Sequence, residues 1–338
     1  MTAACLRPCR APIFSINGRL VALVFVFAAS GCEGPAPPDE HRSGRRRIVS
    51  LAPALTQMVC ALGAEGDLVG VGRHDVCSPI GLRVVGHFQN VNTEAVLDAR
   101  PTHVLAMYTA GAVPDHLERL ARVQGFRLIV YAYPNSIDDV VRMLVTDHGA
   151  AGNVGDGSPP SLSHLLDAAE EGRRQRANIA ATFARIRRLT DGRPRPRVLL
   201  VIGVSPVMAC GGGTVLDDML EKIAARNAVG PSPASAPTFD REGLLRLRPD
   251  VILLLLPGQP PLRPNGNDPR LAAFVGLPIP AVTESRIVLI NDALVLLPGT
   301  SVQQIALRMA AAVHRDLADV LQVSAGPREP GPGTERVE

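Results

Sequence analysis

The stretch Ser161–Thr190, SLSHLLDAAEEGRRQRANIAATFARIRRLT, decides how the rest of the sequence is interpreted. Its apolar residues recur at helical spacing, and they are Leu162, Leu165, Leu166, Ala169, Ile179, Ala180, Phe183, Ile186 and Leu189. Prolines precede the stretch, and Asp191-Gly192 with Pro194 follow it, as expected for the ends of a helix. About 28 residues at 1.5 Å each predict a rod of roughly 40 Å. Such a helix either packs on one domain or joins two.

Short apolar strands alternate with helices on both sides of this stretch. The predicted strands are Arg47–Leu51, Leu68–Val71, Thr102–Met107, Arg127–Tyr131, Arg197–Ile202, Val251–Leu256 and Ile287–Ile290. The predicted helices are Thr56–Leu62, Pro114–Gln124, Ser136–His148, Val215–Ala225 and Ser301–Leu317. This alternation is typical of α/β proteins with largely parallel sheets covered on both faces. We therefore expect an α/β lobe at 47–160, a linking helix at 161–190 and a second α/β lobe at 191–322.

The two halves of the sequence echo each other. Glu94–Leu105, EAVLDARPTHVL, aligns without gaps with Glu242–Leu253, EGLLRLRPDVIL. In each, a Glu opens a short helix, Arg-Pro ends it and a buried strand follows. The helix dipole favours a Glu in the first turn, which accounts for one such residue by itself. The matched pair instead predicts one Glu at an equivalent place on each of two similar lobes.

The N-terminus has the pattern of a targeting segment, which we assign to residues 1–31. Three arginines precede the apolar run Leu20–Ala29, which is too short to span a bilayer. Ala29-Ser30-Gly31-Cys32 resembles a bacterial lipobox, in which Cys32 would carry the lipid anchor; the alternative is a secretory signal with an incidental cysteine. Residues 32–46 then form a predicted unfolded tether, and residues 323–338 a predicted disordered tail.

The composition excludes several classes of function. The 35 Lys and Arg residues nearly balance the 32 Asp and Glu residues, so no basic surface predicts a nucleic-acid partner. Aromatic residues make up 3% of the 338 residues and Trp is absent, so a ligand site cannot be a cage of many rings. Gly211-Gly212-Gly213-Thr214 is neither a dinucleotide nor a phosphate-binding loop, and GxSxG and HExxH do not occur. A binding protein is therefore favoured over an enzyme.

Three cysteines fall in the predicted folded part of the chain: Cys60, Cys77 and Cys210. An odd number allows at most one disulfide and leaves at least one thiol. The spacing is not that of a CxxC zinc site. No metal site is predicted, and buried or unpaired thiols are the favoured interpretation.

Several segments carry a family resemblance, in order along most of 45–317. They are Arg47–Thr56, Ala61–Gly63, Leu68–Val71, Gly86–Phe88, Asn92–Glu94, the strand motif Arg-Pro-x-x-Val-Leu from Arg100, Leu216–Leu220 and Asp240–Glu242. Together they resemble the extracytoplasmic substrate-binding proteins of ABC importers for iron siderophores, heme and vitamin B12. The resemblance implies two Rossmann-like lobes joined by one long rigid helix, which is the class III periplasmic binding protein fold, and a monomer without a resident cofactor.

The resemblance also implies which residues carry the function. One carboxylate on each lobe, Glu94 and Glu242, would dock onto a membrane permease. The ligand face, at the carboxyl ends of the strands, would comprise Arg73, His74, His87, Phe88, Met107, Tyr108, Met208, Asn291 and Asp292. Met and aliphatic side chains suit a large ligand of irregular shape. His74 and His87 are candidate ligands of a heme iron or metal, although a lone loop histidine is more often solvated.

We therefore expect a lipid-anchored protein on the extracytoplasmic face of a bacterial membrane, in the periplasm or its equivalent. It would bind a corrinoid or ferric chelate, which is cobalamin, a siderophore or heme, and deliver it to an ABC permease. The scarcity of aromatic residues argues against vitamin B12 itself. Two alternatives stay open: a sensor or scaffold lipoprotein that keeps the fold without transport, and an α/β enzyme.

Overall fold

The computed structural model describes residues 45–73, 75, 77, 79, 81–87, 90–108, 113–146, 159–263 and 267–321, without the side chain of His87. The predicted signal peptide at 1–31, the lipidation candidate Cys32, most of the predicted tether and the tail at 323–338 lie outside these residues. The described residues from Arg45 onward form one compact unit. The described part of this unit contains two large sheets and one two-stranded sheet, and we call each large sheet with its helices a lobe.

The sheet of the first lobe is entirely parallel, with strand order β3-β2-β1-β6-β7. Its strands are β1 (Ile48–Ser50), β2 (Leu68–Val71), β3 (Arg83–Val84), β6 (His103–Tyr108) and β7 (Arg127–Ala132). The short strands β4 (Gly86–His87) and β5 (Asn90–Val91) pair antiparallel beside it. The four predicted strands of this lobe are confirmed. The sequence pattern missed β3, β4 and β5 because two residues carry no periodic signal.

The sheet of the second lobe has strand order β11-β9-β8-β12-β13, and β10 pairs with β8. Its strands are β8 (Arg197–Val204), β9 (Val207–Ala209), β10 (Arg226–Asn227), β11 (Thr238–Phe239), β12 (Val251–Leu255) and β13 (Ile287–Ile290). Strands β8, β10, β12 and β13 are parallel, whereas β9 runs antiparallel to β8 and β11 antiparallel to β9. The predicted parallel core is therefore correct, with an antiparallel edge that was not predicted.

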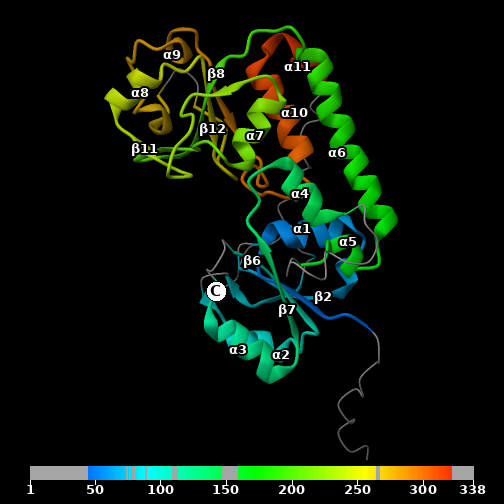
Figure 1. Ribbon diagram of the computed structural model, residues 1–338. Coiled ribbons are helices and arrows are strands. Elements are labelled where there is room, and N and C mark those ends of the chain that lie inside the picture. The colour runs from blue at the N-terminus through cyan, green and yellow to red at the C-terminus, as the bar shows by residue number, and fades with distance from the viewer. Residues whose placement is uncertain are drawn as a thin grey trace, which may run out of the picture. The chain divides into compact units, whose positions relative to one another are not determined.

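Helices cover both faces of each sheet, as the alternating pattern predicted (Figure 1). In the first lobe, α2 (Thr93–Asp98) and α3 (Asp115–Gln124) pack on one face, and α1 (Pro53–Ala61) and α4 (Ile137–Leu144) on the other. In the second lobe, α8 (Arg241–Leu247) and α9 (Pro280–Thr283) share a core on one face. The opposite face carries α7 (Val215–Lys222) and α10 (Val302–Val313), followed by α11 (Ala318–Leu321).

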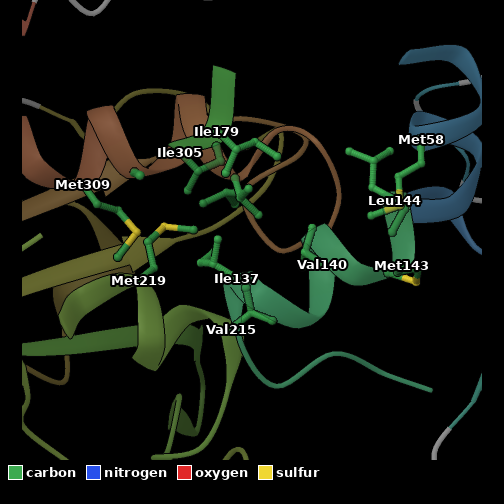
Figure 2. Close-up of a cluster of buried hydrophobic side chains, with 14 of the residues drawn as sticks. Met58, Ile137, Val140, Met143, Leu144, Ile179, Val215, Met219, Ile305 and Met309 are labelled. Atoms are coloured by element: carbon green, nitrogen blue, oxygen red, sulfur yellow. The ribbon is translucent and has the colours of Figure 1, made fainter. Parts of the chain in front are cut away.

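One hydrophobic cluster joins the two lobes. It contains buried residues of both sheets, such as Leu105 and Leu253, and buried residues from the helices between the sheets. Figure 2 shows the helical part, in which Ile137 and Val140 of α4 lie among side chains of α6, α7 and α10, while Leu144 reaches Met58 of α1. We call this the shared core. Each lobe also has an outer cluster of its own on the far face of its sheet.

The predicted continuous helix at 161–190 is wrong in its first turns. The structure has two helices there, α5 (Leu162–Leu165) and α6 (Ala169–Thr190), and Asp167 between them has a φ of 54°. The 22 residues of α6 run beside α10 (Figure 1). Gly172 allows α5 to pack back onto α6, because a Cβ at this position would lie 2.6 Å from the Cβ of Ser163.

A distant arginine stabilises this break. The Arg46 guanidinium donates hydrogen bonds to the carbonyl oxygens of Leu165 (3.1 Å) and Leu166 (2.9 Å) and to the carboxylate of Asp167 (2.6 Å). Carbonyls at a helix end need partners, and here a cation supplies them. Arg46 was predicted to end an unfolded tether; it is instead fixed to the folded body, also through Asp67 (3.1 Å).

Two other predicted helices are shorter than their patterns. The helix predicted at Ser136–His148 begins with the predicted capping box of Ser136 and Asp139 but ends at Leu144, because Val145 is extended. The helix predicted at Ser301–Leu317 ends at Val313, where His314 turns inward and its Nε2 lies 2.9 Å from the carbonyl oxygen of Ile223. The second helix thus ends where His314 makes a tertiary contact, whereas the first ends where the backbone becomes extended at Val145.

Polar contacts complement the shared core where the lobes meet. The backbone N–H of Ile137, at the start of α4, donates to the Asp218 carboxylate of α7 (2.7 Å). Lys222 lies 3.5 Å from Asp218 and 3.9 Å from Asp138. The second lobe thus supplies the anion that the N-terminus of the first-lobe helix favours. Asp218 was part of the family motif in the sequence, and this contact gives it a structural role.

The aligned segments Glu94–Leu105 and Glu242–Leu253 also have similar structures. Arg100 and Arg248, aligned in the two halves, have φ values of 43° and 41°, uncommon for residues other than glycine. In each half an arginine at the start of the central strand donates to the carbonyl oxygens that end the short helix: Arg47 to Ala99 (2.8 Å) and Arg197 to Leu247 (3.1 Å). The same Arg-Pro break therefore adopts the same geometry in both lobes.

We predict that Ile179→Ala lowers the free energy of unfolding by about 2 to 5 kcal/mol, because it opens a cavity in the shared core. Ile179 is 2% exposed, whereas Val123 of α3 is 77% exposed and serves as the matched control. Urea unfolding followed by circular dichroism measures both variants. An Ile179→Ala variant as stable as Val123→Ala would contradict the shared core.

We predict that Asp218→Ala lowers the free energy of unfolding by about 1 to 2 kcal/mol, because the Ile137 N–H loses its acceptor and Lys222 loses an ion pair. Asp218→Asn keeps an acceptor oxygen and should lose less. The same urea titration ranks wild type, Asp218→Asn and Asp218→Ala. An equal loss of unfolding free energy in the two variants would show that only the charge of Asp218 matters. No loss in either variant would show that Asp218 does not stabilise the contact between the lobes.

Candidate functional site

The carboxyl ends of the first-lobe strands form one edge of that sheet, where α/β proteins bind ligands. Arg73 follows β2 at this edge, and its backbone N–H donates to the carbonyl oxygen of Gly86 (2.5 Å). Arg73 is exposed and lies next to the backbone of His87 in β4, and the role of both residues in ligand binding stays a prediction. His74 and Phe88 lie outside the described residues.

Met107 and Tyr108 end β6 at the same edge, but protein already covers most of both side chains. Met107 is 6% exposed and belongs to the shared core, and Tyr108 is 7% exposed and belongs to the outer cluster of the first lobe. Burial also raises the pKa of the Tyr108 hydroxyl. A ligand would reach them only at the rim of this edge, and their role in binding stays a prediction.

The predicted second-lobe residues lie on strands β9 and β13 or directly after them. Met208 is half-buried in β9, opposite Gly203 of β8. Asn291 is exposed after β13, and its Nδ2 donates to the carbonyl oxygen of Gln259 (2.8 Å), which ties together the loops that follow β12 and β13. These two residues are placed where a ligand-binding role is possible.

Asp292 has a structural role that the sequence did not indicate. Its carboxylate accepts a hydrogen bond from the backbone N–H of Leu294 (2.8 Å) and lies 3.3 Å from the Arg308 guanidinium of α10. Only 6% of the Asp292 side chain is exposed. The carboxylate holds the loop after β13 against α10, so protein partners already occupy the atoms that were predicted to meet a ligand.

Tyr133 is a candidate that the sequence analysis missed. It directly follows β7 at the carboxyl edge, is 50% exposed, and donates its backbone N–H to the carbonyl oxygen of Tyr108 (3.2 Å). Partial burial, with the charge of the nearby Cys210 thiol as a smaller cause, raises the pKa of its hydroxyl. Tyr133 of the first lobe therefore lies near Cys210 of the second lobe. A one-residue extension of the predicted strand would have placed it at the edge.

The two predicted docking residues occupy equivalent positions. Glu94 lies in the first turn of α2, and Glu242 in the first turn of α8. The Asn92 side chain caps α2, and the Asp240 side chain caps α8. Both glutamates are exposed, and Glu242 pairs only with Arg246 of its own helix (2.7 Å) among the ion pairs described. Two carboxylates thus stand at matching helix starts, one on each lobe.

Two cavities were found that do not involve the predicted ligand residues. One of about 520 Å³ lies where α4, α6 and α7 meet, and its wall includes Arg142, Arg176, Phe183 and Lys222. One of about 500 Å³ lies at the turn between β8 and β9, next to the start of α8. The first has an apolar floor, and two of its cations lie beside acidic residues: Arg142 pairs with Asp139, and Lys222 with Asp138 and Asp218.

Within the described ranges, no set of three or more His, Cys, Asp or Glu residues is grouped so that it could hold a metal ion. Among the helices of that same part of the chain, none is both long and apolar enough to cross a membrane.

The chain is similar in sequence to curated vitamin B12-binding proteins. No family model matches the chain. The vitamin B12-binding protein of Pectobacterium carotovorum is 26% identical over 217 residues, which are 62% of this chain and 71% of that protein. The vitamin B12-binding protein of Photorhabdus laumondii is 25% identical over 212 residues, 62% of this chain and 70% of that protein.

Solved structures of binding proteins share the fold. The periplasmic heme-binding protein RhuT from Roseiflexus sp. RS-1, in its apo form, superposes with a TM-score of 0.60 at 24% identity over 82% of this chain and all of its own (100%). The periplasmic vitamin B12-binding protein BtuF of Vibrio cholerae gives a TM-score of 0.62 at 18% identity over 80% of this chain and 97% of its own. The resemblance seen in the sequence is thus confirmed: the chain is similar in sequence to proteins named for binding vitamin B12, and it shares the two-lobed α/β fold of the periplasmic binding proteins.

Proposed function

We propose that this protein is the substrate-binding component of an ABC importer and that it holds a corrinoid or ferric chelate between its lobes. The division into lobes at 47–160 and 191–322, linked through 161–190, is part of this proposal. The observation that carries it is the extent of the likeness: proteins named for binding heme or vitamin B12 match about four fifths of this chain and nearly all of their own length. Those relatives are named as binding proteins, which favours a binding function over an enzymatic one.

The shared core supports this function physically. Hinge opening would separate α4 from α6, α7 and α10, and each buried side chain exposed would cost about 1.5 to 3 kcal/mol. Closure around a ligand should therefore be small compared with binding proteins whose lobes meet through flexible strands. A bulky, rigid cargo such as a macrocyclic chelate suits a site that changes little in width.

The side chains at the carboxyl ends of the strands favour some ligands over others. Arg73 offers a cation for a carboxylate or phosphate, Tyr133 offers a half-exposed ring and hydroxyl, and Met208 offers a soft apolar contact. Heme propionates and ferric siderophores carry negative charge that Arg73 would complement. With so few rings available, cobalamin is the less favoured member of the class.

Delivery to a permease is the second part of the proposal. Exposed carboxylates contribute little to folding stability, but two fixed on matching helix starts can set the register of a basic partner and speed the encounter. Glu94 and Glu242 have this arrangement. A lipid on Cys32 would hold the monomeric protein at the extracytoplasmic face of the membrane, near the permease.

A sensor or scaffold protein that keeps this fold is the second candidate. The burial of Met107 and Tyr108 and the engagement of Asp292 by Arg308 favour it, because groups expected to meet a ligand already meet protein. The two functions differ in one measurable property, which is whether the protein binds a chelate in solution.

We predict that one of hemin, cobalamin, cobinamide and a ferric hydroxamate raises the melting temperature of the purified mature protein. At a ligand concentration of about 100 Kd, linkage adds about 2.7 kcal/mol to stability, which is a shift of several degrees. Differential scanning fluorimetry or calorimetry measures it. A Tyr133→Ala variant with wild-type stability should bind that compound more weakly. No shift with any compound would favour the scaffold.

We predict that Glu94→Arg with Glu242→Arg abolishes uptake of the bound compound in cells that carry the cognate permease, because the reversed charges repel a basic docking surface. Ligand affinity of the purified variant should stay unchanged. Glu118→Arg with Glu284→Arg, two exposed positions on α3 and beside α9, is the matched control and should transport normally. Loss of affinity in the first variant would place the glutamates in the binding site instead.

A further inference from the structure

Two of the three described cysteines lie against each other in the first lobe. Cys60 is in the last turn of α1, and Cys77 is in the loop between β2 and β3. The Cys60 Sγ lies 3.6 Å from the backbone carbonyl oxygen of Cys77. The oxygen and Cβ of one residue are about 3 Å apart by covalent geometry. The Cys60 sulfur thus lies against Cys77, and both thiols are free in this structure.

The backbone around both cysteines is held by hydrogen bonds. The Cys77 N–H donates to Oδ1 of Asp75 (2.9 Å), and the Asp75 N–H donates to the carbonyl oxygen of Gly72 (3.2 Å). The Cys60 carbonyl accepts from the Gly63 N–H at the end of α1 (3.0 Å). These hydrogen bonds fix the backbone of the turn and of the helix end that carry the two cysteines.

The surroundings disfavour two separate functional thiols. Burial, with the charges of Glu65 and Asp75 as smaller causes, raises the pKa of Cys60. Burial and the charge of Asp75 raise the pKa of Cys77 to about 12. Reactive or metal-binding cysteines need the thiolate, which this acidic and partly buried environment opposes. The raised pKa values slow disulfide formation, which also begins with a thiolate, but a disulfide once formed has no titratable group and is not affected by them.

Cys210 does not compete for either partner. It is 5% exposed, follows β9 in the second lobe, and its carbonyl oxygen accepts from Asn227 Nδ2 (3.1 Å). Of the three described cysteines, Cys60 and Cys77 are therefore neighbours, and Cys210 is a separate buried thiol.

We propose that Cys60 and Cys77 form a disulfide in the exported protein and that this bond ties the loop after β2 to α1. Two S–H bonds break and one S–S bond forms; the two protons and two electrons pass to a protein disulfide oxidant of the extracytoplasmic space, whose own disulfide becomes two thiols. The proposal needs export to an oxidising compartment and no ligand. The bond fixes the segment that carries Arg73 whether or not that residue binds a chelate.

Peptide mapping of the protein purified from the extracytoplasmic compartment tests the bond directly. Free thiols are alkylated in denaturant without reductant, and the digest is analysed by mass spectrometry. We expect a cross-linked peptide containing Cys60 and Cys77, which reductant separates, and an alkylated Cys210. The cross-link should persist in Cys210→Ser. Alkylated Cys60 and Cys77, or a link from either one to Cys210, would overturn the proposal.

Thermal unfolding gives a second, independent measurement. A disulfide closing a loop of this length should raise the melting temperature by roughly 5 to 10 °C over the reduced protein. Reductant should lower the melting temperature of wild type and of Cys210→Ser by this amount, and leave the double variant Cys60→Ser, Cys77→Ser unchanged. An equal effect of reductant on the double variant would contradict the assignment. Both measurements are independent of ligand binding, so failure of the proposed function would not affect them.

Discussion

The shared core between α4, α6, α7 and α10 is the constraint on which the rest of the structure depends. Each sheet has its own outer cluster and would be an ordinary α/β lobe, but their inner faces are buried against a common set of helices. The lobes are therefore joined by packing and not only by chain. The capping of α4 by Asp218 and the hydrogen bonds from Ser301 to Gln57 of α1 also hold the two lobes in a fixed relative position. A binding site between the carboxyl edges of the two sheets would therefore have a nearly constant width.

The internal repeat explains why two surface carboxylates occupy matching places. In both lobes a short capped helix ends at an arginine with positive φ, a proline follows, and a buried strand enters the centre of the sheet. An arginine at the start of the neighbouring strand donates to the last carbonyls of that helix, in one lobe as in the other. The break is costly for the backbone, and the same side-chain contact compensates it twice. The matching positions of Glu94 and Glu242 are explained by this repeated unit and require no ligand.

The site could be predicted only in part, and the reason differs between residues. Arg73 and Asn291 are exposed at strand ends, where the rule that ligands meet the carboxyl edge of a parallel sheet leads us to expect ligand contacts, and their role in binding stays a prediction. The same rule selected Met107, Tyr108 and Asp292, although a sequence cannot say which face a strand-end side chain turns to or which cation reaches a carboxylate. Tyr133 was missed because the strand prediction stopped at Tyr131. The pairing of Cys60 with Cys77 depends on how a helix and a loop meet, which spacing does not encode.

The sequence by itself determined the α/β class, the main strands, most helix starts and the twofold echo, because these follow from periodicity, caps and Gly or Pro breaks within a few residues. Tertiary structure decided where helices end and what joins the lobes. The apolar spacing and the end signals predict one helix over 161–190, yet Arg46, more than a hundred residues earlier, holds the carbonyls at Leu165 and Leu166 where that helix is divided. Local free energies along a helix differ by tenths of a kcal/mol, so one well-placed guanidinium or one buried interface is enough to override them.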